Sequence, residues 1–307
     1  MPLHPQIQAM IDKVAHLPPL QTIPVEAIRA TDMARYTLGV LRDEVAHVED
    51  RHIPGPRGNI RIRIYRPDMQ PMRPVVVFFH GSGFVICSID THDAMCRQIC
   101  RRSGCIVVSV DYRLAPENKF PAAPDDGYAA TQWASRHAPE IGGDPARLAV
   151  CGDSVGGNLA AVVALRARDE GGPPIAAQIL LYPVTDHYSV ERPSWQQRGK
   201  GCGLTRDAMR WFWDLYLAHP DEGAHPHASP MRAKSLARLP KAYVITGEYD
   251  LLRDEGEDYA QRLKQAGVAV DSVRYDDMNH GFLNWVGLVD RSTQAMDAIC
   301  AWLKKSL

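Results

Sequence analysis

Short, nearly continuous apolar runs alternate with amphipathic segments along most of the chain. Strands that are buried on both faces of a parallel sheet have this pattern. Such runs occupy Val75–Phe79, Cys105–Val110, Arg147–Cys151 and Ala176–Tyr182, and two more follow at 242–247 and 268–275. Helical spacing and helix start and stop signals lie between them and predict helices over His92–Arg102, Ala122–His137, Ser154–Arg168, Arg253–Gln265 and Arg291–Lys305.

Two regions depart from this alternation. Residues 1–45 have a helical pattern, with an apolar stripe formed by Ile28, Met33, Leu38 and Leu41. The segment 185–230 is aromatic and polar, and within it Met209–Leu217 is helical in pattern but apolar almost all round, so it must cover or be covered by another surface. We expect these two regions to form a lid.

An alternating pattern from Glu44 to Tyr65 predicts a two-stranded hairpin that turns at residues 54–59. Together with the later runs, it predicts one α/β domain over residues 1–307. Its sheet is mostly parallel, carries helices on both faces and is led by an antiparallel hairpin. The lid, or cap, consists of about 1–45 and 185–230.

Composition narrows the classes of partner. The chain has 307 residues, with 35 Lys and Arg against 36 Asp and Glu, so no charge excess favours nucleic acid or an acidic membrane surface. No apolar run is long enough to span a membrane, and the first residues lack the apolar core of a signal peptide, so we expect a cytoplasmic protein. The sequence does not determine the oligomeric state, and a homodimer is one of the possibilities.

The cysteines do not form a recognisable framework. They are odd in number, seven, and several lie inside apolar runs, which is typical of reduced, buried thiols. Cys96 and Cys100 would share a helix face, but no matching Cys or His pair follows, so we expect no metal site.

The segment Cys151–Gly157, CGDSVGG, lies between a predicted strand and a predicted helix. Its glycines fit neither a dinucleotide fingerprint nor a phosphate-binding P-loop. The remaining interpretation is G-x-S-x-G, the sharp turn that presents a nucleophile, here Ser154. Side chains two positions to either side of that serine would collide with the neighbouring strand and helix, which explains Gly152 and Gly156.

A serine hydroxyl needs a base, and the base needs a carboxylate that orients it. Asp250 and His280 each follow a predicted strand, and the chain order Ser, Asp, His is the one that this turn accompanies. Two rivals for the acid are Glu248, earlier in the same loop, and Asp254, which a helix start would explain as a cap. Among the twelve histidines, only His280 combines a loop after a strand, a following glycine and the right order.

Attack on a carbonyl also requires donors for the oxyanion. The N–H of Val155, directly after the nucleophile, is one candidate. The loop after the strand Val75–Phe79 offers further backbone donors at Gly81, Ser82 and Gly83, and we expect His80 to pack under that loop as a structural residue.

Five motifs, FFHGSGF, DYRLAPENKFPAA, GDSVGGNLA, YDLLRDEGEDYAQRL and NHGF, occur in this order. Jointly they resemble the hormone-sensitive-lipase-like esterases of the α/β-hydrolase fold (bacterial family IV), and the resemblance spans essentially the full chain. It implies an α/β-hydrolase fold with a helical cap, and Ser154, Asp250 and His280 as nucleophile, acid and base. It further implies an oxyanion hole from the N–H groups of Ser82, Gly83 and Val155.

The resemblance also implies roles outside this centre. Arg113 and Glu117 would fix the loop beneath the active site, and a pocket for the acyl or alcohol group would draw on four aromatic residues, Phe84, Trp211, Trp213 and Phe282. The chain departs from the family in three places: Ser82 where the motif H-G-G-G has glycine, Val155 where alanine is usual, and Leu251 where D-P-L is common. A positive φ at Ser82 would cost roughly 1 kcal/mol.

These observations predict a serine carboxylesterase that hydrolyses short- to medium-chain esters, a small-molecule substrate, with no metal and no organic cofactor. An amidase, a deacetylase or a lactone hydrolase would use the same residues. A ligand-binding receptor of the same fold is a further alternative, but it would have no need of the base.

Overall fold

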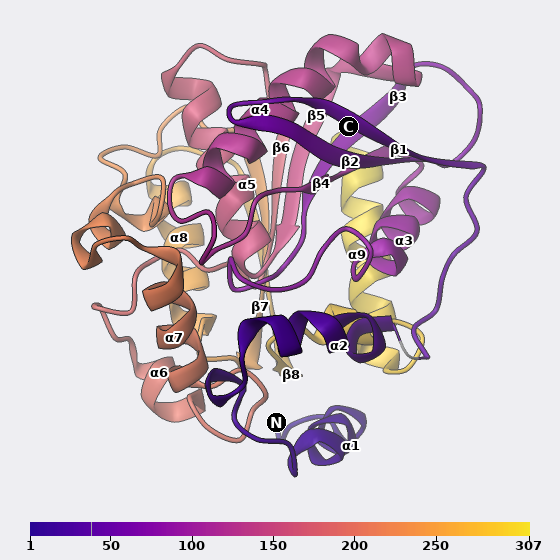
Figure 1. Cartoon of the computed structure of the whole chain (residues 1–307). Coiled ribbons are helices and arrows are strands. Elements are labelled where there is room, and N and C mark those ends of the chain that lie inside the picture. Colours follow the sequence, from indigo (N-terminus) through magenta and orange to yellow (C-terminus); the bar gives the residue numbers. More distant parts are fainter. Residues whose placement is uncertain (38) are drawn as a thin grey trace.

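The apolar runs form an eight-stranded sheet in the order β1-β2-β4-β3-β5-β6-β7-β8 (Figure 1). The computed structural model describes residues 1–37 and 39–307. β1 pairs antiparallel with β2, β2 pairs antiparallel with β4, and every later pair is parallel. The strands are β1 (His47–Gly55), β2 (Gly58–Arg66), β3 (Arg73–Phe79), β4 (Ile106–Asp111), β5 (Gly143–Asp153), β6 (Ala177–Leu181), β7 (Lys241–Tyr249) and β8 (Val270–Asn279). The predicted hairpin and mostly parallel sheet of the α/β-hydrolase fold are confirmed.

Successive side chains of the central strands enter two different cores. In β3, Val75, Val77 and Phe79 pack in one core, whereas Val76 and Phe78 pack in the other. All five side chains are fully buried. A strand covered on both faces has no polar face, and this explains why its sequence is a continuous apolar run.

Helices close both cores (Figure 1). α3 (Asp93–Ser103) and α9 (Asp290–Ser306) contact each other on one face. The other face carries α4 (Ala122–His137), α5 (Val155–Asp169) and α8 (Arg253–Gln265). The five helices agree with the predicted ones to within one residue at every end. Short 3₁₀ helices join the elements: η1 (Leu20–Thr22), η2 (Ala138–Ile141), η3 (Pro220–Ala224), η4 (Pro230–Arg232) and η5 (Phe282–Trp285).

The N-terminal region contains two separate helices, α1 (Pro5–Val14) and α2 (Val25–Thr37). The predicted apolar stripe is wrong at two positions. Ile28 is buried, but Met33 and Leu41 are each 46% exposed, because α2 ends at Thr37 and packs through the turn that contains Ile28. Leu38 lies outside the described residues.

The segment 185–230 contributes α6 (Pro193–Arg198) and α7 (Arg206–Tyr216). Figure 1 shows α2, α6 and α7 gathered at the end of the sheet where the parallel strands terminate. α7 buries Met209, Phe212, Trp213 and Tyr216, so the nearly all-round apolar pattern reflects a helix whose inner face is covered. Within the described part of the chain, no helix has the length and apolarity that crossing a membrane would require.

No disulfide joins the cysteines within residues 1–37 and 39–307. Six of them are buried and Cys202 is half-buried. The prediction that most of the thiols are buried is confirmed. Among the described residues, no three His, Cys, Asp or Glu side chains gather as a metal-binding group.

Candidate active site

Ser154 occupies the turn between β5 and α5 in an unusual backbone conformation, φ 57° and ψ −118°. The surrounding glycines leave no room for side chains. A Cβ atom on Gly156 would lie 1.9 Å from the carbonyl oxygen of Phe79, and one on Gly152 would lie 2.2 Å from the oxygen of Gly156. The turn therefore has the close packing that the G-x-S-x-G spacing predicts.

The structure brings the three predicted side chains together. The Nε2 atom of His280 lies 2.9 Å from Ser154 Oγ, and its Nδ1 atom lies 2.7 Å from Asp250 Oδ2. Asp250 comes directly after β7 and His280 directly after β8, so both stand at the carboxyl edge of the sheet. An Asp250 oxygen that accepts from Nδ1 favours the tautomer with the proton on Nδ1, which leaves Nε2 able to accept the serine proton.

Asp250 is held in place by its own contacts. It is 1% exposed, and its Oδ1 atom accepts a hydrogen bond of 2.8 Å from the backbone N–H of Leu252. The imidazole of His280 is packed edge-on against Tyr182, with ring centroids 5.0 Å apart. One carboxylate oxygen therefore fixes the loop while the other faces the imidazole.

The two rival carboxylates face elsewhere. Asp254 lies in the first turn of α8, where it accepts a hydrogen bond from the N–H of Ser194 and pairs with Arg253, both at 2.7 Å. Glu248 pairs with Arg198 and Arg253, also at 2.7 Å. Of the three acids considered, only Asp250 contacts His280.

The hydroxyl of Ser82 belongs to a directional chain of hydrogen bonds. The N–H of Phe84 donates to Ser82 Oγ (2.9 Å), and Tyr112 Oη donates to the carbonyl of His80 (2.6 Å). The proton between Ser82 Oγ and Tyr112 Oη, 2.7 Å apart, must then come from Ser82, because the tyrosine proton is already used. These hydrogen bonds join the two ends of the loop 80–84, which we call the oxyanion loop after the role predicted for it.

The oxyanion loop leaves selected backbone donors free. Within the ranges 1–37 and 39–307, no acceptor meets the N–H groups of Ser82, Gly83 or Val155. Gly83 has φ 56°, whereas Ser82 is not among the residues with positive φ, so the strain considered for Ser82 does not arise.

The oxyanion loop is also tied to the nucleophile turn. Asp153, directly before Ser154, accepts a hydrogen bond of 2.7 Å from the N–H of Gly81. Burial acts to raise the pKa of this carboxyl group, but His92 and the hydrogen bond from the Gly81 N–H together hold the pKa below its usual value. A carboxylate in this position fixes the loop relative to the turn.

His80 is fully buried, and its ring stacks on Tyr112 with centroids 4.4 Å apart. Burial, followed by the charge of nearby His92, lowers the pKa of His80 to about 3. The imidazole is therefore neutral, in keeping with the structural role expected for it.

The predicted pocket residues separate into two groups. Trp211 is partly exposed, whereas Phe84, Trp213 and Phe282 have no exposed surface. The rings of Phe84, Trp213 and Phe282 pack into the cores, and only Trp211 has surface exposed to solvent. A part in substrate binding stays a prediction for all four residues.

The two residues expected to fix the neighbouring loop both form ion pairs. Arg113 binds Asp126 at 2.7 Å, and Glu117 binds Arg29 of α2 at 2.8 Å. Arg29 also donates to the carbonyl oxygens of Val85 (2.8 Å) and Ala115 (2.7 Å). The sequence pattern gave no signal for Arg29, which attaches α2 to the chain that follows the oxyanion loop.

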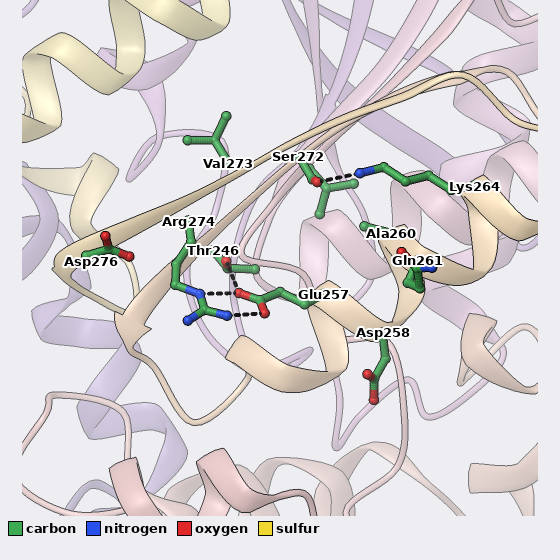
Figure 2. A pocket seen from close by; sticks show the side chains of 11 residues that line it. Thr246, Glu257, Asp258, Ala260, Gln261, Lys264, Ser272, Val273, Arg274 and Asp276 are labelled. Atoms are coloured by element: carbon green, nitrogen blue, oxygen red, sulfur yellow. Dashed lines mark hydrogen bonds and ion pairs between the residues drawn. The ribbon is translucent and has the colours of Figure 1, made fainter.

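A groove of about 560 Å³ lies between α8 and the edge of the sheet formed by β7 and β8, and residues of these three elements line it (Figure 2). Several of its polar side chains form hydrogen bonds with one another. Arg274 pairs with Glu257, which also accepts from Thr246, and Lys264 donates to Ser272. None of the predicted site residues lines this groove.

Known proteins share this arrangement. The family described as the alpha/beta hydrolase fold matches residues 76–284 of the chain. The chain belongs to this family. The carboxylic ester hydrolase LipN of Mycobacterium tuberculosis is 45% identical over 266 residues, 85% of this chain and 70% of LipN. The esterase LipI of the same organism is 41% identical over 301 residues, 95% of this chain and 92% of LipI.

A solved structure extends the likeness to three dimensions. The hyperthermophilic esterase from the archaeon Pyrobaculum calidifontis matches this α/β-hydrolase with a TM-score of 0.96 and 41% identity, over 99% of each chain. The resemblance to hormone-sensitive-lipase-like esterases is thereby confirmed.

The hydrogen bonds of Ser82 generate a first prediction. Ser82→Ala and Tyr112→Phe each break the chain across the oxyanion loop, so we expect kcat for ester hydrolysis to fall by about 10-fold or more as the backbone donors lose their positions. Steady-state kinetics on a p-nitrophenyl ester measures this. Ser103→Ala is the matched control, because Ser103 is a buried serine that also bonds two backbone groups, Ile99 O and Cys105 N. Equal kcat values in all variants would contradict the assignment.

The buried, neutral His80 generates a second prediction. Its pKa is about 3 when folded against an ordinary 6.5, so the unfolded chain binds a proton that the folded chain excludes. The associated stability is complete above pH 6.5 and is lost as the pH falls from about 6.5 towards 3. Urea unfolding at a series of pH values should show a shallower decline in His80→Phe, which keeps an aromatic ring against Tyr112. Parallel curves for the two proteins would show that His80 does not contribute.

Proposed function

We propose that the chain is a serine carboxylesterase that hydrolyses carboxylic esters through an acyl-enzyme at Ser154. The observation that carries this proposal is the hydrogen-bonded line Ser154 Oγ, His280 Nε2, His280 Nδ1 and Asp250 Oδ2, with distances of 2.9 and 2.7 Å. A hydroxyl so placed can give up its proton to the imidazole as it attacks a carbonyl carbon.

The reaction proceeds in two halves. In the first, Ser154 Oγ attacks the ester carbonyl, its proton moves to His280 Nε2, and the tetrahedral intermediate expels the alcohol, which takes that proton. In the second, a water molecule gives a proton to His280 and attacks the acyl-enzyme, and the acid leaves as Ser154 regains its hydrogen. Asp250 stabilises the imidazolium in both halves without taking up the proton.

The oxyanion hole supports the same chemistry. We assign the negative charge of each tetrahedral intermediate to the N–H groups of Ser82, Gly83 and Val155, which have no acceptor among the described residues. Val155 begins α5, and the positive end of the helix dipole favours an anion there. Donors already in position stabilise the charge as it develops, with no cost of reorganisation at that moment.

A helical cap would define the substrate. We assign it to about residues 1–45 and 185–230 of one domain, because α2 and α7 both contact the segment that follows β3. The cap is short and its aromatic rings are largely buried, which favours short to medium acyl chains over long lipids. LipN and LipI, whose names describe ester hydrolysis, support the same substrate class.

The nucleophile assignment predicts the effect of Ser154→Ala. Without the hydroxyl no acyl-enzyme forms, so kcat should fall on the order of 10⁶-fold. The assay is release of p-nitrophenol from p-nitrophenyl esters of rising chain length, with circular dichroism to confirm that the variant is folded. Wild-type activity should be highest for the short and medium chains. If the alanine variant hydrolysed these esters as fast as wild type, Ser154 would not be the nucleophile.

The acid assignment predicts a contrast between two neighbouring carboxylates. Asp250→Asn should lower kcat by about 10⁴-fold, because an amide favours the wrong tautomer of His280. Asp254→Asn is the matched control, since it removes a half-buried carboxylate four residues away that contacts Ser194 and Arg253 but not His280. Its kcat should stay close to wild type in the same assay. A larger loss of kcat in Asp254→Asn than in Asp250→Asn would instead identify Asp254 as the acid that orients His280.

A further inference from the structure

The inner face of helix α7 packs directly against the oxyanion loop. Tyr216 stacks face to face on Phe84, with ring centroids 3.6 Å apart and an interplanar angle of 2°. Trp213 contacts the same phenylalanine at 5.6 Å. Both tryptophan and tyrosine are fully buried, so Phe84 is enclosed by α7.

A further residue on the inner face of α7, Phe212, packs against the backbone of Gly83. A Cβ atom at Gly83 would be 2.4 Å from the Cγ and Cδ1 atoms of the Phe212 ring. The ring therefore occupies the space beside the Gly83 backbone. It is itself only 4% exposed, so it has little freedom to move away.

Gly83 needs such an external restraint. Glycine adopts positive and negative φ about equally readily, so its own sterics do not select the φ of 56° that is observed. The direction of the Gly83 N–H depends on that backbone conformation. The aromatic ring packed on one side of Gly83 blocks the alternative arrangements of the loop.

We infer that Phe212 is a positioning residue for the oxyanion hole: its ring fixes the backbone of Gly83 so that the N–H stays aimed at the developing oxyanion. This inference rests on the proposed esterase function. It assigns to an element of the cap a part in the chemical step, in addition to any part in binding substrate.

Hydrogen bonds from the segment 115–120 hold the C-terminal end of α7, and with it Phe212, in place. The N–H of Phe120 donates to the carbonyl of Tyr216 (2.9 Å), and Lys119 Nζ donates to the carbonyl of Leu217 (2.7 Å). The same segment returns to the oxyanion loop, since the N–H of Ala115 donates to the carbonyl of Phe84 (2.9 Å). The loop, the segment 115–120 and α7 thus form a closed ring of contacts.

A positioning role has a distinct kinetic consequence. The oxyanion bears its full charge only in the tetrahedral state, so a misaimed donor weakens binding of that state more than binding of the ester. Loss of the Phe212 ring should therefore lower kcat while KM changes little. Affinity for a reversible tetrahedral mimic, such as an alkyl boronic acid that adds to Ser154, should fall in parallel with kcat.

The experiment compares Phe212→Ala and Phe212→Leu with wild type on one p-nitrophenyl ester. Phe212→Ala should lower kcat by about 10-fold, leave KM within about threefold, and raise the Ki of the boronic acid by about the same factor as kcat falls. Phe212→Leu should shift kcat and Ki in the same directions by a smaller factor. Met209→Ala is the matched control, because Met209 is a buried residue on the inner face of the same helix, three residues earlier. It should lose stability without a rise in Ki.

Several results would overturn the inference while leaving the esterase function intact. One is wild-type kcat and Ki in Phe212→Ala, and another is a loss expressed in KM alone. A rise in Ki as large in Met209→Ala as in Phe212→Ala would also count against it, since general loosening of α7 would then explain the effect. If Phe212→Ala does not fold, unchanged kcat and Ki in Phe212→Leu overturn it. Failure of the esterase function is a separate result, namely equal hydrolysis by wild type and Ser154→Ala.

Discussion

The structure depends on one constrained turn, in which Ser154 adopts φ 57° between β5 and α5. A non-glycine residue in this region costs roughly 1–2 kcal/mol, so it persists only because its surroundings hold it. Ser154 N–H donates to Leu181 O (2.8 Å), and Ser154 O accepts from Val184 N–H (3.1 Å). The absence of side chains at Gly152 and Gly156 lets the strand and helix meet closely enough to keep the turn sharp.

The remaining parts of the site are supplied to that turn by segments far apart in the chain. The parallel strands end at one edge, which places Asp250 and His280 beside the hydroxyl. Asp153 and the Ser82–Tyr112 hydrogen bond hold the oxyanion loop from within, whereas α7 holds it from outside. Because Asp250 is almost fully buried, its attraction for the imidazolium acts in a medium of lower dielectric than water and is correspondingly stronger.

The sequence predicted those features that depend on local spacing or on strand order. Buried strands, the turn at Ser154 and the positions of Asp250 and His280 after successive strands all follow from such patterns. The contacts of Arg29, Tyr112 and Phe212 could not be predicted in this way, because each depends on side-chain directions in segments that meet only in the folded chain. The same reason explains the error at Met33, which has helical spacing but faces solvent. It also explains why the sequence did not show that the rings of Phe84, Trp213 and Phe282 pack inward.

The central claim, that the turn presents an activated hydroxyl to an electrophile, can be tested by covalent labelling. A p-nitrophenyl alkylphosphonate should phosphonylate one residue per chain with release of one equivalent of p-nitrophenol, and mass spectrometry of the digested protein should locate the adduct on Ser154. The labelling rate should fall by orders of magnitude in His280→Gln, because the base is lost. An adduct on another residue, or labelling of Ser154 at an unchanged rate without His280, would contradict the account.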